Sequence, residues 1–507
     1  MSLIKPFQTW RARNPAKIAI VFEERSWTYA EFDRLTDNVA RNILAAGAEP
    51  GDRVALHLLN GPESAMANIG CLKAGCTLVP INTRLKGREI DYILRHSGSV
   101  FYVGQPDLYA EIIGSCPAMS ELNARYLSDG HVGSGIRSFH DLLETPAYGV
   151  SLPEIPAEHV AAILYTSGTT ANPKGVVHGH DTVMQTAHMM RQMGLDEDQV
   201  VLVMSSMAHM IGFVMLFLSA LLNGATTVIT RPFECLSALS AYEHWNCTYT
   251  LALPVMFKLL VEAQLRAQRN ITSGRFFFCG GDCVSPALQE VFQRSFAPIC
   301  EAYGTTEVAP ISWNRPGDVR VGSIGKPGGG VAFRLVDSRG CDVEPGEVGE
   351  VWLQGPHMMR GYWQDAEATA AAFHDGWFRT GDLAYGDEHG FYWFAGRKKE
   401  IIVRGGSNIS PQEVEAVLYE HPAVGEVAVV GHPHPVWGEG VAAHVVLQPG
   451  KRLEGSELIA FARSRLADYK VPDTVVFQSE LPKGPTGKLQ RRVLREAHLG
   501  YTTEVSV

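Results

Sequence analysis

The sequence has few of the features that mark secreted, membrane-embedded or metal-scaffolded proteins. Its nine cysteines are an odd number in 507 residues, and none of their spacings forms a CxxC pair or a CxxC…HxxxH array. Neither a disulfide framework nor structural zinc is therefore expected. The longest apolar run, Met210 to Leu222, has thirteen residues. A membrane-spanning helix needs about 20, so this run predicts a buried core helix. The N-terminal stretch lacks the apolar segment of a signal peptide, and we expect a cytoplasmic protein.

Basic residues are also in the minority. The chain has 44 Lys and Arg against 54 Asp and Glu, which gives a formal net charge of −10. This balance disfavours nucleic acid and anionic membranes as partners and favours small molecules. With 46% hydrophobic and 19% charged residues, the composition excludes disordered and collagen-like chains. At about 150 residues per domain, the length corresponds to roughly three domains.

The first hundred residues alternate helical and strand patterns. Thr28 and Glu31 form a capping box that predicts a helix running to Gly47. The periodicity further predicts strands at 53–59, 76–81 and 100–104 and helices at 62–75 and 87–98. Such alternation is typical of parallel sheets covered by helices, so we predict an α/β fold.

The predicted secondary structure changes twice toward the C-terminus. Short strands and Gly-rich turns predict a β-rich subdomain at about 320–397, which completes a large N-terminal domain over 1–397. Residues 398–507 then predict a small α+β domain. Its first helix begins with the cap residues Ser410, Pro411 and Glu413. Further elements are expected at 428–430, 441–447, 456–469 and 474–477.

The segment YTSGTTANPKG, Tyr165–Gly175, has the composition of a phosphate-binding loop. It follows the apolar strand AAIL and combines hydroxyl side chains, an exposed glycine backbone and the positive charge of Lys174. It is not a Walker loop, because Lys174 precedes Gly175 instead of a Ser or Thr. No GxGxxG fingerprint follows a strand, which disfavours a nicotinamide or flavin enzyme.

Five further motifs follow this loop, and with it they resemble those of the adenylate-forming superfamily of acyl-CoA synthetases, nonribosomal adenylation domains and firefly luciferases. The five are YGTTE at 303–307, GWFRTGD at 376–382, GRKKE at 396–400, the pair Gly405 and Gly406, and PKGPTGK at 482–488. Their order and spacing match the superfamily, and the resemblance covers nearly the whole chain. One departure is Ala171, where the superfamily usually has a glycine, and its extra methyl group could stiffen the loop.

The resemblance implies an ATP-dependent acyl-CoA ligase that uses ATP, Mg²⁺ and coenzyme A. A carboxylate attacks the α-phosphorus of ATP to give an acyl-adenylate and pyrophosphate, and CoA then forms the thioester. By this resemblance Glu307 helps to hold Mg²⁺ and the hydroxyl of Thr306 contacts the α-phosphate. Lys488 reaches into the site during adenylation and bridges the acyl carboxylate and the α-phosphate, a task that suits a compact ammonium on a long stem.

The same resemblance assigns further residues to ATP, CoA and domain motion. Asp382 accepts both ribose hydroxyls and Arg397 makes a ribose-side contact, although either residue could instead belong to a structural ion pair. Lys399 is the hinge of a mobile C-terminal domain, and Gly405 with Gly406 lines the pantetheine tunnel. The remaining residues assigned to ATP are Thr166, Ser167, Gly168, Thr169, Thr170, Lys174, Gly280, Gly281, Asp282, Tyr303, Gly304 and Thr305.

The acyl pocket is assigned to His209, Met210, Phe213 and Gly304. The acetate-specific branch has a Trp after the position of Tyr303, whereas Gly304 here leaves the pocket open. We therefore expect a fatty or aromatic acid, with His209 as a wall of the pocket and not a base.

Other functions remain open from the sequence alone. An adenylate-forming enzyme could load a carrier protein, and a luciferase-like oxygenase is chemically possible. A non-catalytic nucleotide-binding protein would be expected to have lost Glu307 or Lys488, and both are present. Because Lys488 must be cationic and accessible, a protein acetyltransferase is a further possible partner that would switch adenylation off. The sequence does not indicate the oligomeric state.

Overall fold

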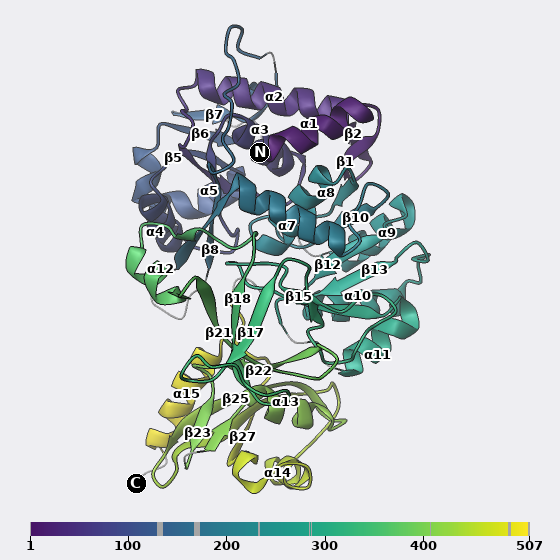
Figure 1. The fold of residues 1–507 in the computed structure, drawn as a ribbon, viewed down its shortest axis with the longest axis vertical. Helices are drawn as coiled ribbons and strands as arrows, with labels where there is room; N and C mark the ends of the chain where they lie inside the picture. Colours follow the sequence, from purple (N-terminus) through teal and green to yellow (C-terminus); the bar gives the residue numbers. More distant parts are fainter. Residues whose placement is uncertain are drawn as a thin grey trace. The chain divides into compact units, whose positions relative to one another are not determined.

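The computed structural model describes residues 2–128, 135–144, 146–166, 173–231, 234–282, 284, 286–405, 407–484 and 488–504. The chain forms two compact units (Figure 1). Unit 1 consists of Met1–Ala332 and Gln354–Gly376, and unit 2 of Phe333–Leu353 and Trp377–Val507. The α/β class that the sequence predicts is confirmed, whereas the functional boundary at 397 and 398 stays a prediction.

Unit 1 contains a nine-stranded sheet in which the strands that alternate with helices run parallel. Its strands, in sheet order, are β16 (Lys326–Pro327), β15 (Ser312–Trp313), β14 (Ile299–Tyr303), β13 (Phe276–Cys279), β12 (Tyr249–Ala252), β10 (Val200–Val203), β11 (Thr226–Ile229), β1 (Ile18–Phe22) and β2 (Arg25–Thr28).

The second sheet of unit 1 has eight strands. In sheet order they are β19 (Gly361–Tyr362), β9 (Lys174–Gly179), β8 (Val160–Thr166), β4 (Thr77–Pro80), β3 (Arg53–His57), β5 (Ser99–Gly104), β6 (Ala124–Leu127) and β7 (Ile136–Ser138). Strands β8, β4, β3 and β5 are parallel neighbours, as the alternating pattern predicts. Strands β8 and β9 instead form an antiparallel hairpin, which the sequence analysis did not anticipate.

Twelve α-helices of unit 1 lie among the described residues. They are α1 (Ile4–Arg13), α2 (Tyr29–Ala45), α3 (Pro62–Lys73), α4 (Gly87–Ser97), α5 (Pro106–Ile112), α6 (His140–Leu143), α7 (His180–Gln192), α8 (Ser219–Leu222), α9 (Cys235–Trp245), α10 (Pro254–Arg266), α11 (Pro286–Ser295) and α12 (Ala366–Ala372). The capping box that opens α2 is present, since Thr28 accepts from the backbone N–H of Glu31 and the Glu31 carboxylate accepts from that of Thr28.

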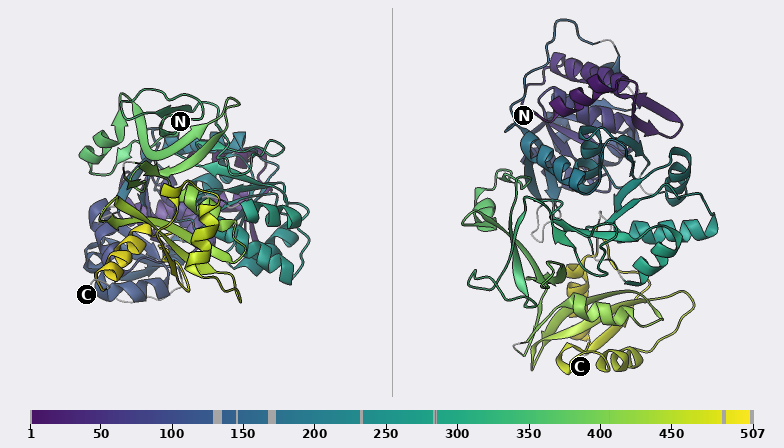
Figure 2. Two further views of the ribbon diagram at one scale, coloured as in Figure 1. Left: turned by 90° about the horizontal axis from the view of Figure 1, so that it is seen from below. Right: turned by 45° about the vertical axis from the view of Figure 1, so that its right-hand side comes forward.

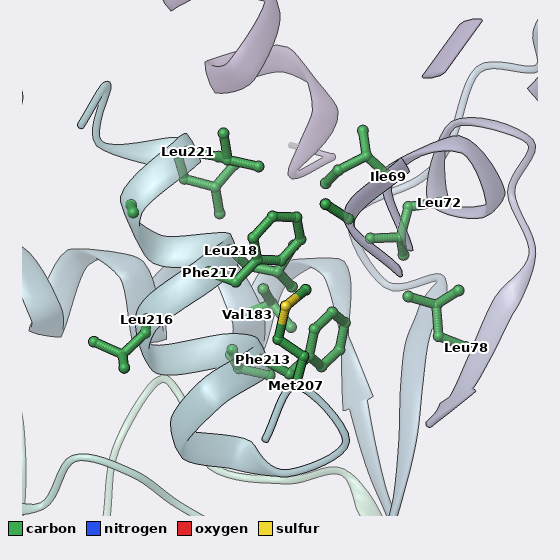
Figure 3. Packing of buried hydrophobic residues seen from close by; sticks show 14 of the residues in the cluster. Ile69, Leu72, Leu78, Val183, Met207, Phe213, Leu216, Phe217, Leu218 and Leu221 are labelled. Carbon is green, nitrogen blue, oxygen red and sulfur yellow. The ribbon is translucent and has the colours of Figure 1, made fainter. Parts of the chain in front are cut away.

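The predicted buried helix after Met210 is confirmed, with one difference in its winding. Residues Ile211–Leu218 form a π-helix, which continues directly into α8. Figure 3 shows Phe213 and Phe217 of this helix on the side of Ile69 and Leu72 of α3 and Leu78 of β4, and Leu216 on the opposite side. The wider turn of a π-helix commonly marks a functional region, and this one follows the segment that carries His209.

Unit 2 contains two smaller sheets. The first runs in the order β17 (Ala332–Val336), β18 (Gly349–Gln354) and β21 (Trp377–Gly386), and β22 (Tyr392–Arg397) pairs with β21. The second runs in the order β24 (Ser407–Ile409), β23 (Ile402–Arg404), β26 (Gly438–Leu447) and β25 (Val424–His434), with β27 (Thr474–Phe477) paired to β26.

Three helices cover the second sheet of unit 2, namely α13 (Pro411–Tyr419), α14 (Gly455–Arg463) and α15 (Arg491–Glu504). The last of them, drawn in yellow, lies against that sheet in Figure 2. Ser410 caps α13 by accepting from the backbone N–H of Glu413, as its sequence predicts. The buried face of α13 packs on β25 through Val414 and Leu418, so this unit has a core of its own.

Candidate active site

The predicted phosphate loop connects the two strands of the β8–β9 hairpin. Thr166 at the end of β8 lies opposite Lys174 at the start of β9, so both ends of the loop are fixed by one ladder. Ser167, Gly168, Thr169, Thr170 and Ala171 lie outside the described residues. The ammonium of Lys174 lies 4.8 Å from the ring centroid of Tyr362, a cation–π contact that holds the amine near the loop.

Tyr362 also reaches the acid that is predicted to hold magnesium. Its hydroxyl donates to Oε1 of Glu307 over 2.9 Å. Burial, and then the carboxylate of Glu307, raise the pKa of Tyr362 far above its usual value. The phenol therefore stays protonated and orients the carboxylate as a donor. Lys174, Tyr362 and Glu307 thus form one connected cluster from three separate parts of the sequence.

The YGTTE motif follows β14 as a tight turn. The backbone N–H of Thr305 donates to the carbonyl of Val308 over 2.9 Å. A Cβ at Gly304 would lie 2.8 Å from the Cβ of Ala309, so this turn has no room for a side chain there. The glycine is therefore required by the packing of its own loop, whatever its predicted role at the acyl pocket. Thr306 and Glu307 lie inside this turn, at the carboxyl end of the parallel strand β14.

Gly280 and Gly281 lie at the carboxyl end of the neighbouring strand β13. A Cβ at Gly280 would lie 2.7 Å from the carbonyl oxygen of Ala302, and Gly281 has φ +86°, where a side chain is strained. These glycines allow the loop that continues to Asp282 to approach β14 closely. Ligands of open α/β sheets bind at this edge, outside the carboxyl ends of the strands.

His209 follows β10 at the same edge of the sheet. Asn60 fixes the preceding segment, because its side chain donates to the carbonyl of Ser205 over 2.9 Å and accepts from the N–H of Met207 over 2.8 Å. Burial, and then the charge of Arg84, lower the pKa of His209 to about 4. A neutral imidazole at this position suits the wall of an apolar pocket.

Met210 and Phe213, which we predict to line the acyl pocket, are both buried and belong to the main hydrophobic core of unit 1. Figure 3 shows Phe213 in this core. Their role at the pocket stays a prediction.

The residues predicted to contact the ribose lie together in unit 2. Asp382 on β21 faces Arg397 on β22, and Nε of Arg397 lies 3.2 Å from Oδ1 of Asp382. The Asp382 carboxylate is nearly buried, at 4% exposure, whereas a third of the Arg397 side chain is exposed.

The next residue, Lys398, is anchored to the same sheet. Its backbone N–H donates to the carbonyl of Gly381 over 2.9 Å, and its ammonium donates to the buried carboxylate of Glu350 over 3.0 Å. The chain is therefore fixed up to residue 398, directly before the predicted hinge at Lys399.

Lys399 and Lys488 are electrostatic neighbours within unit 2. Burial is the largest cause that lowers the pKa of Lys399, and the charges of Arg397 and Lys488 act in the same direction. The carbonyl of Lys488 accepts from the N–H of Gly484 over 2.7 Å, which closes the PKGPTGK loop.

Of the two glycines assigned to the pantetheine tunnel, Gly405 has φ +56°, and a Cβ there would lie 3.1 Å from the Trp437 ring. Gly406 lies outside the described residues.

Comparison with known proteins matches two family models. One described as "AMP-binding enzyme" covers residues 7–363, and one described as "AMP-binding enzyme C-terminal domain" covers residues 413–488. The chain belongs to the AMP-binding enzyme family. Its relatives place it in the acyl-CoA ligase branch, so the predicted acid–thiol ligase chemistry through an acyl-adenylate is confirmed.

Three relatives illustrate the match. A feruloyl-CoA synthase of an Amycolatopsis species is 34% identical over 492 residues, which cover 96% of this chain and 97% of the relative. A long-chain-fatty-acid–CoA ligase of Mycobacterium tuberculosis is 32% identical and covers 93% of each chain. The crystal structure of an anthranilate CoA ligase in complex with anthranoyl-AMP superposes with a TM-score of 0.90 at 28% identity, covering 99% of this chain and 98% of that one.

A single carboxylate, that of Glu307, is available for a metal shared with substrate phosphates. Among the residues that the structure describes, no group of three or more His, Cys, Asp or Glu side chains gathers to hold a metal. Mg²⁺ in nucleotide enzymes is commonly held by one or two carboxylates together with water and substrate phosphates. Glu307, oriented by Tyr362, offers such a carboxylate.

No helix in the described ranges is long and apolar enough to cross a membrane.

Two contributors to the site escaped the sequence analysis. Tyr362 lies 55 residues from Glu307 along the chain, and Asn60 lies 145 residues from Ser205. Their contacts depend on how the two sheets of unit 1 come together, which local patterns do not encode. The only available signal for Tyr362 was its place in the short GYW segment before a helix.

Proposed function

We propose that this enzyme activates an aromatic carboxylic acid with ATP and transfers the acyl group to coenzyme A. In the first step an oxygen of the carboxylate bonds to the α-phosphorus and pyrophosphate leaves. In the second step the CoA thiolate bonds to the acyl carbon and AMP leaves. The connected cluster of Lys174, Tyr362 and Glu307 at the base of the phosphate loop is the observation that supports this chemistry.

The first step brings two anions together, so cations and hydrogen-bond donors must supply most of the catalysis. We assign Lys174 and the hydroxyl-rich loop to the β- and γ-phosphates and Thr306 to the α-phosphate. Glu307 would hold Mg²⁺, which when bound neutralises phosphate charge. Neither step needs a strong general base, because carboxylates are ionised at neutral pH. The lowered pKa of His209 makes its imidazole a weak base, which agrees with this absence of a strong base.

Unit 2 supplies the remaining roles in this proposal. Asp382 accepts the ribose hydroxyls, and Arg397 holds the Asp382 carboxylate in place. Lys488 supplies charge to the carboxylate and the α-phosphate during adenylation. Lys399 then acts as the hinge between adenylation and thioester formation, and Gly405 borders the path of pantetheine. Acetylation of Lys488 by a protein acetyltransferase would remove its charge and stop the first step.

An aromatic acid is favoured by the relatives that act on feruloyl and anthranoyl groups. A fatty acid is the second candidate, because a long-chain-fatty-acid–CoA ligase is nearly as similar. Both suit a pocket walled by the neutral His209 and apolar side chains. Both cosubstrates, ATP and CoA, are abundant in the cytoplasm, and we propose that compartment.

Pyrophosphate release tests the proposal directly. The protein is incubated with ATP and Mg²⁺ and with hydroxycinnamic acids, benzoic acids, a long-chain fatty acid or acetate, each with and without CoA. We expect the fastest release with an aromatic acid, one turnover without CoA and many turnovers with it. Glu307→Gln serves as the inactive control. If no acid stimulates release, the ligase function is wrong; if only an added carrier protein supports turnover, CoA is not the acceptor.

A further inference from the structure

Two buried histidines lie beneath the segment that carries Glu307. His178 belongs to β9, and His357 lies between β18 and β19 in unit 1. Both are fully buried, and neither was part of any motif in the sequence. Both histidines contact residues 306–310, a segment that begins inside the turn of the YGTTE motif.

Each histidine donates one hydrogen bond to a backbone carbonyl of this segment. Nε2 of His178 lies 2.8 Å from the carbonyl oxygen of Thr306, and Nε2 of His357 lies 2.7 Å from that of Pro310. A carbonyl oxygen only accepts, so both Nε2 atoms carry the hydrogen. In His178 the other nitrogen, Nδ1, lies 3.4 Å from the hydroxyl of Thr182, which also reaches the carbonyl of Gly179 over 3.1 Å.

Burial favours the neutral form of both rings, and Nε2 remains a hydrogen-bond donor in that form. Burial lowers the pKa of His178, although the hydrogen bond to Thr306 and the nearby Glu307 act in the opposite direction. Burial lowers the pKa of His357 to about 4, with the hydrogen bond to Pro310 acting in the opposite direction and the charge of His178 in the same one. The two rings are close enough to influence each other electrostatically, so their neutral forms avoid the repulsion that two charged rings would have.

Further contacts complete the restraint on the same segment. The carbonyl of Glu307 accepts from the backbone N–H of Met359 over 2.7 Å, and the Glu307 carboxylate accepts from Tyr362. The carbonyls of residues 306, 307 and 310 are thus each bonded to a partner on β9 or on the segment from 357 to 359. Losing one donor would leave a buried carbonyl unsatisfied and let the segment shift.

We propose that His178 and His357 are positioning residues for adenylate formation, which hold residues 306–310 so that Thr306 and Glu307 face the α-phosphate and the metal. This inference rests on the proposed ligase function. It differs from an ordinary structural role because it predicts a selective loss of the first step, where Thr306 and Glu307 act. Binding of the acid, and CoA attack on a preformed adenylate, do not depend on that alignment.

Paired substitutions separate the donor from the bulk of the ring. Gln places an N–H near the position of Nε2, whereas Met fills a similar volume without a donor. For His178→Met and His357→Met we expect the rate of pyrophosphate release to fall about 10-fold or more, since a buried acceptor loses its partner. The Mg²⁺ concentration at half-maximal rate should rise, and KM for the acid should stay unchanged. His178→Gln and His357→Gln should recover most of the rate.

His180→Met provides a matched control. His180 is also fully buried, lies two residues from His178, and contacts Ser2 instead of the 306–310 segment. It should lower the melting temperature without changing the Mg²⁺ dependence. All variants are compared by circular dichroism, and thioester formation from a supplied acyl-adenylate is measured alongside.

The outcomes distinguish the possibilities. Met variants with a wild-type rate and Mg²⁺ dependence would overturn the positioning role, as would Gln variants no better than the Met variants. Equal losses in His180→Met would also overturn it, because they would show a general packing effect. If one Met variant fails to fold, the substitution at the other histidine still decides. A wild-type protein without acid-dependent pyrophosphate release would overturn the ligase function together with this inference, whereas an active wild type with insensitive variants overturns this inference alone.

Discussion

Nε of Arg397 lies 3.2 Å from Oδ1 of Asp382, and the two residues face each other across the antiparallel strands β21 and β22. The sequence assigned each of them to the ribose separately and left a structural ion pair as the alternative. The pairing makes these readings compatible, because a carboxylate has two oxygens and several acceptor positions. Arg397 can orient the nearly buried carboxylate while Asp382 still accepts hydrogen bonds from a ligand.

Substituting Asp382 with Asn tests this arrangement. An amide keeps one acceptor oxygen but loses the charge, and hydrogen bonds to charged groups contribute about 1.5–3 kcal/mol. We therefore expect KM for ATP to rise by roughly tenfold or more, with little change in KM for the acid. Steady-state kinetics with ATP as the varied substrate would measure this. Glu350→Gln, which breaks the Lys398 pair in the same sheet, should lower the melting temperature and leave KM for ATP unchanged. If Asp382→Asn also lowers the melting temperature and leaves KM for ATP unchanged, the Asp382–Arg397 pair is purely structural.

Replacing Lys488 with Ala should abolish adenylation but spare CoA attack on a supplied acyl-adenylate. The lysine carbonyl accepts from Gly484, and an alanine keeps this backbone contact, so the loop conformation should survive. Lys483→Ala is the control in the same loop, because its ammonium pairs with Glu426 at the surface over 2.8 Å. Both half-reactions are measured separately. Equal losses in the two half-reactions of Lys488→Ala would show that the lysine acts in both steps or stabilises the loop.

A proline at residue 399 should produce the opposite pattern. Lys398 is fixed to the sheet through Gly381 and Glu350, and we propose Lys399, the next residue, as the hinge about which the following chain rotates. Proline fixes φ at this residue and restricts residue 398 as well. Accumulated acyl-adenylate with slow thioester formation is expected in single-turnover experiments, whereas Lys399→Ala should form the thioester normally. Thioester formation at the wild-type rate in Lys399→Pro would place the hinge elsewhere.

Local features of the fold were predictable because their causes lie within a few residues. The caps at Thr28 and Ser410 each bond to a backbone N–H three residues later, and both helices begin where the sequence predicts. The apolar run after Met210 likewise predicted burial, since Ser219 is the only polar side chain within it. Its π-helical winding was not predictable, because an apolar run fixes what is buried and not the hydrogen-bond register.

The site was predictable only where a motif is continuous in the sequence. Glu307 and Lys174 each lie in such a motif, but the Tyr362 side chain that contacts both arrives from a distant strand. His178 and His357 escaped for the same reason, since a buried histidine gives no periodic signal and its partners become neighbours only when the two sheets of unit 1 associate. The residues that carry the chemistry could therefore be predicted from the motifs. The contacts that position those motifs could not, because they join residues far apart in the sequence.

Glu301 predicts a pH dependence of stability. This carboxyl lies two residues before Tyr303 and is almost fully buried, and the amide of Gln289 donates to it over 2.6 Å. Burial raises its pKa from 4.5 to about 7, although hydrogen bonds from Val284, Gly322 and Gln289 favour the ionised form. The folded protein therefore retains a proton that the unfolded chain releases as the pH rises from about 4.5 to 7.

The sign of the effect follows from this difference in bound protons. Below about pH 4.5 both states are protonated and Glu301 contributes no pH dependence. Between the two pKa values the unfolded state binds fewer protons, so the folded state loses stability as the pH rises, by at most on the order of 3 kcal/mol above pH 7.

Glu301→Gln removes the titration and keeps an acceptor for Gln289. The melting temperature of the variant minus that of wild type should be larger at pH 8 than at pH 5. Glu426→Gln, at an exposed ion pair, serves as the control for the loss of a surface charge. Melting curves of Glu301→Gln and wild type that differ by the same amount at both pH values would contradict the raised pKa, since only a titrating group makes that difference depend on pH.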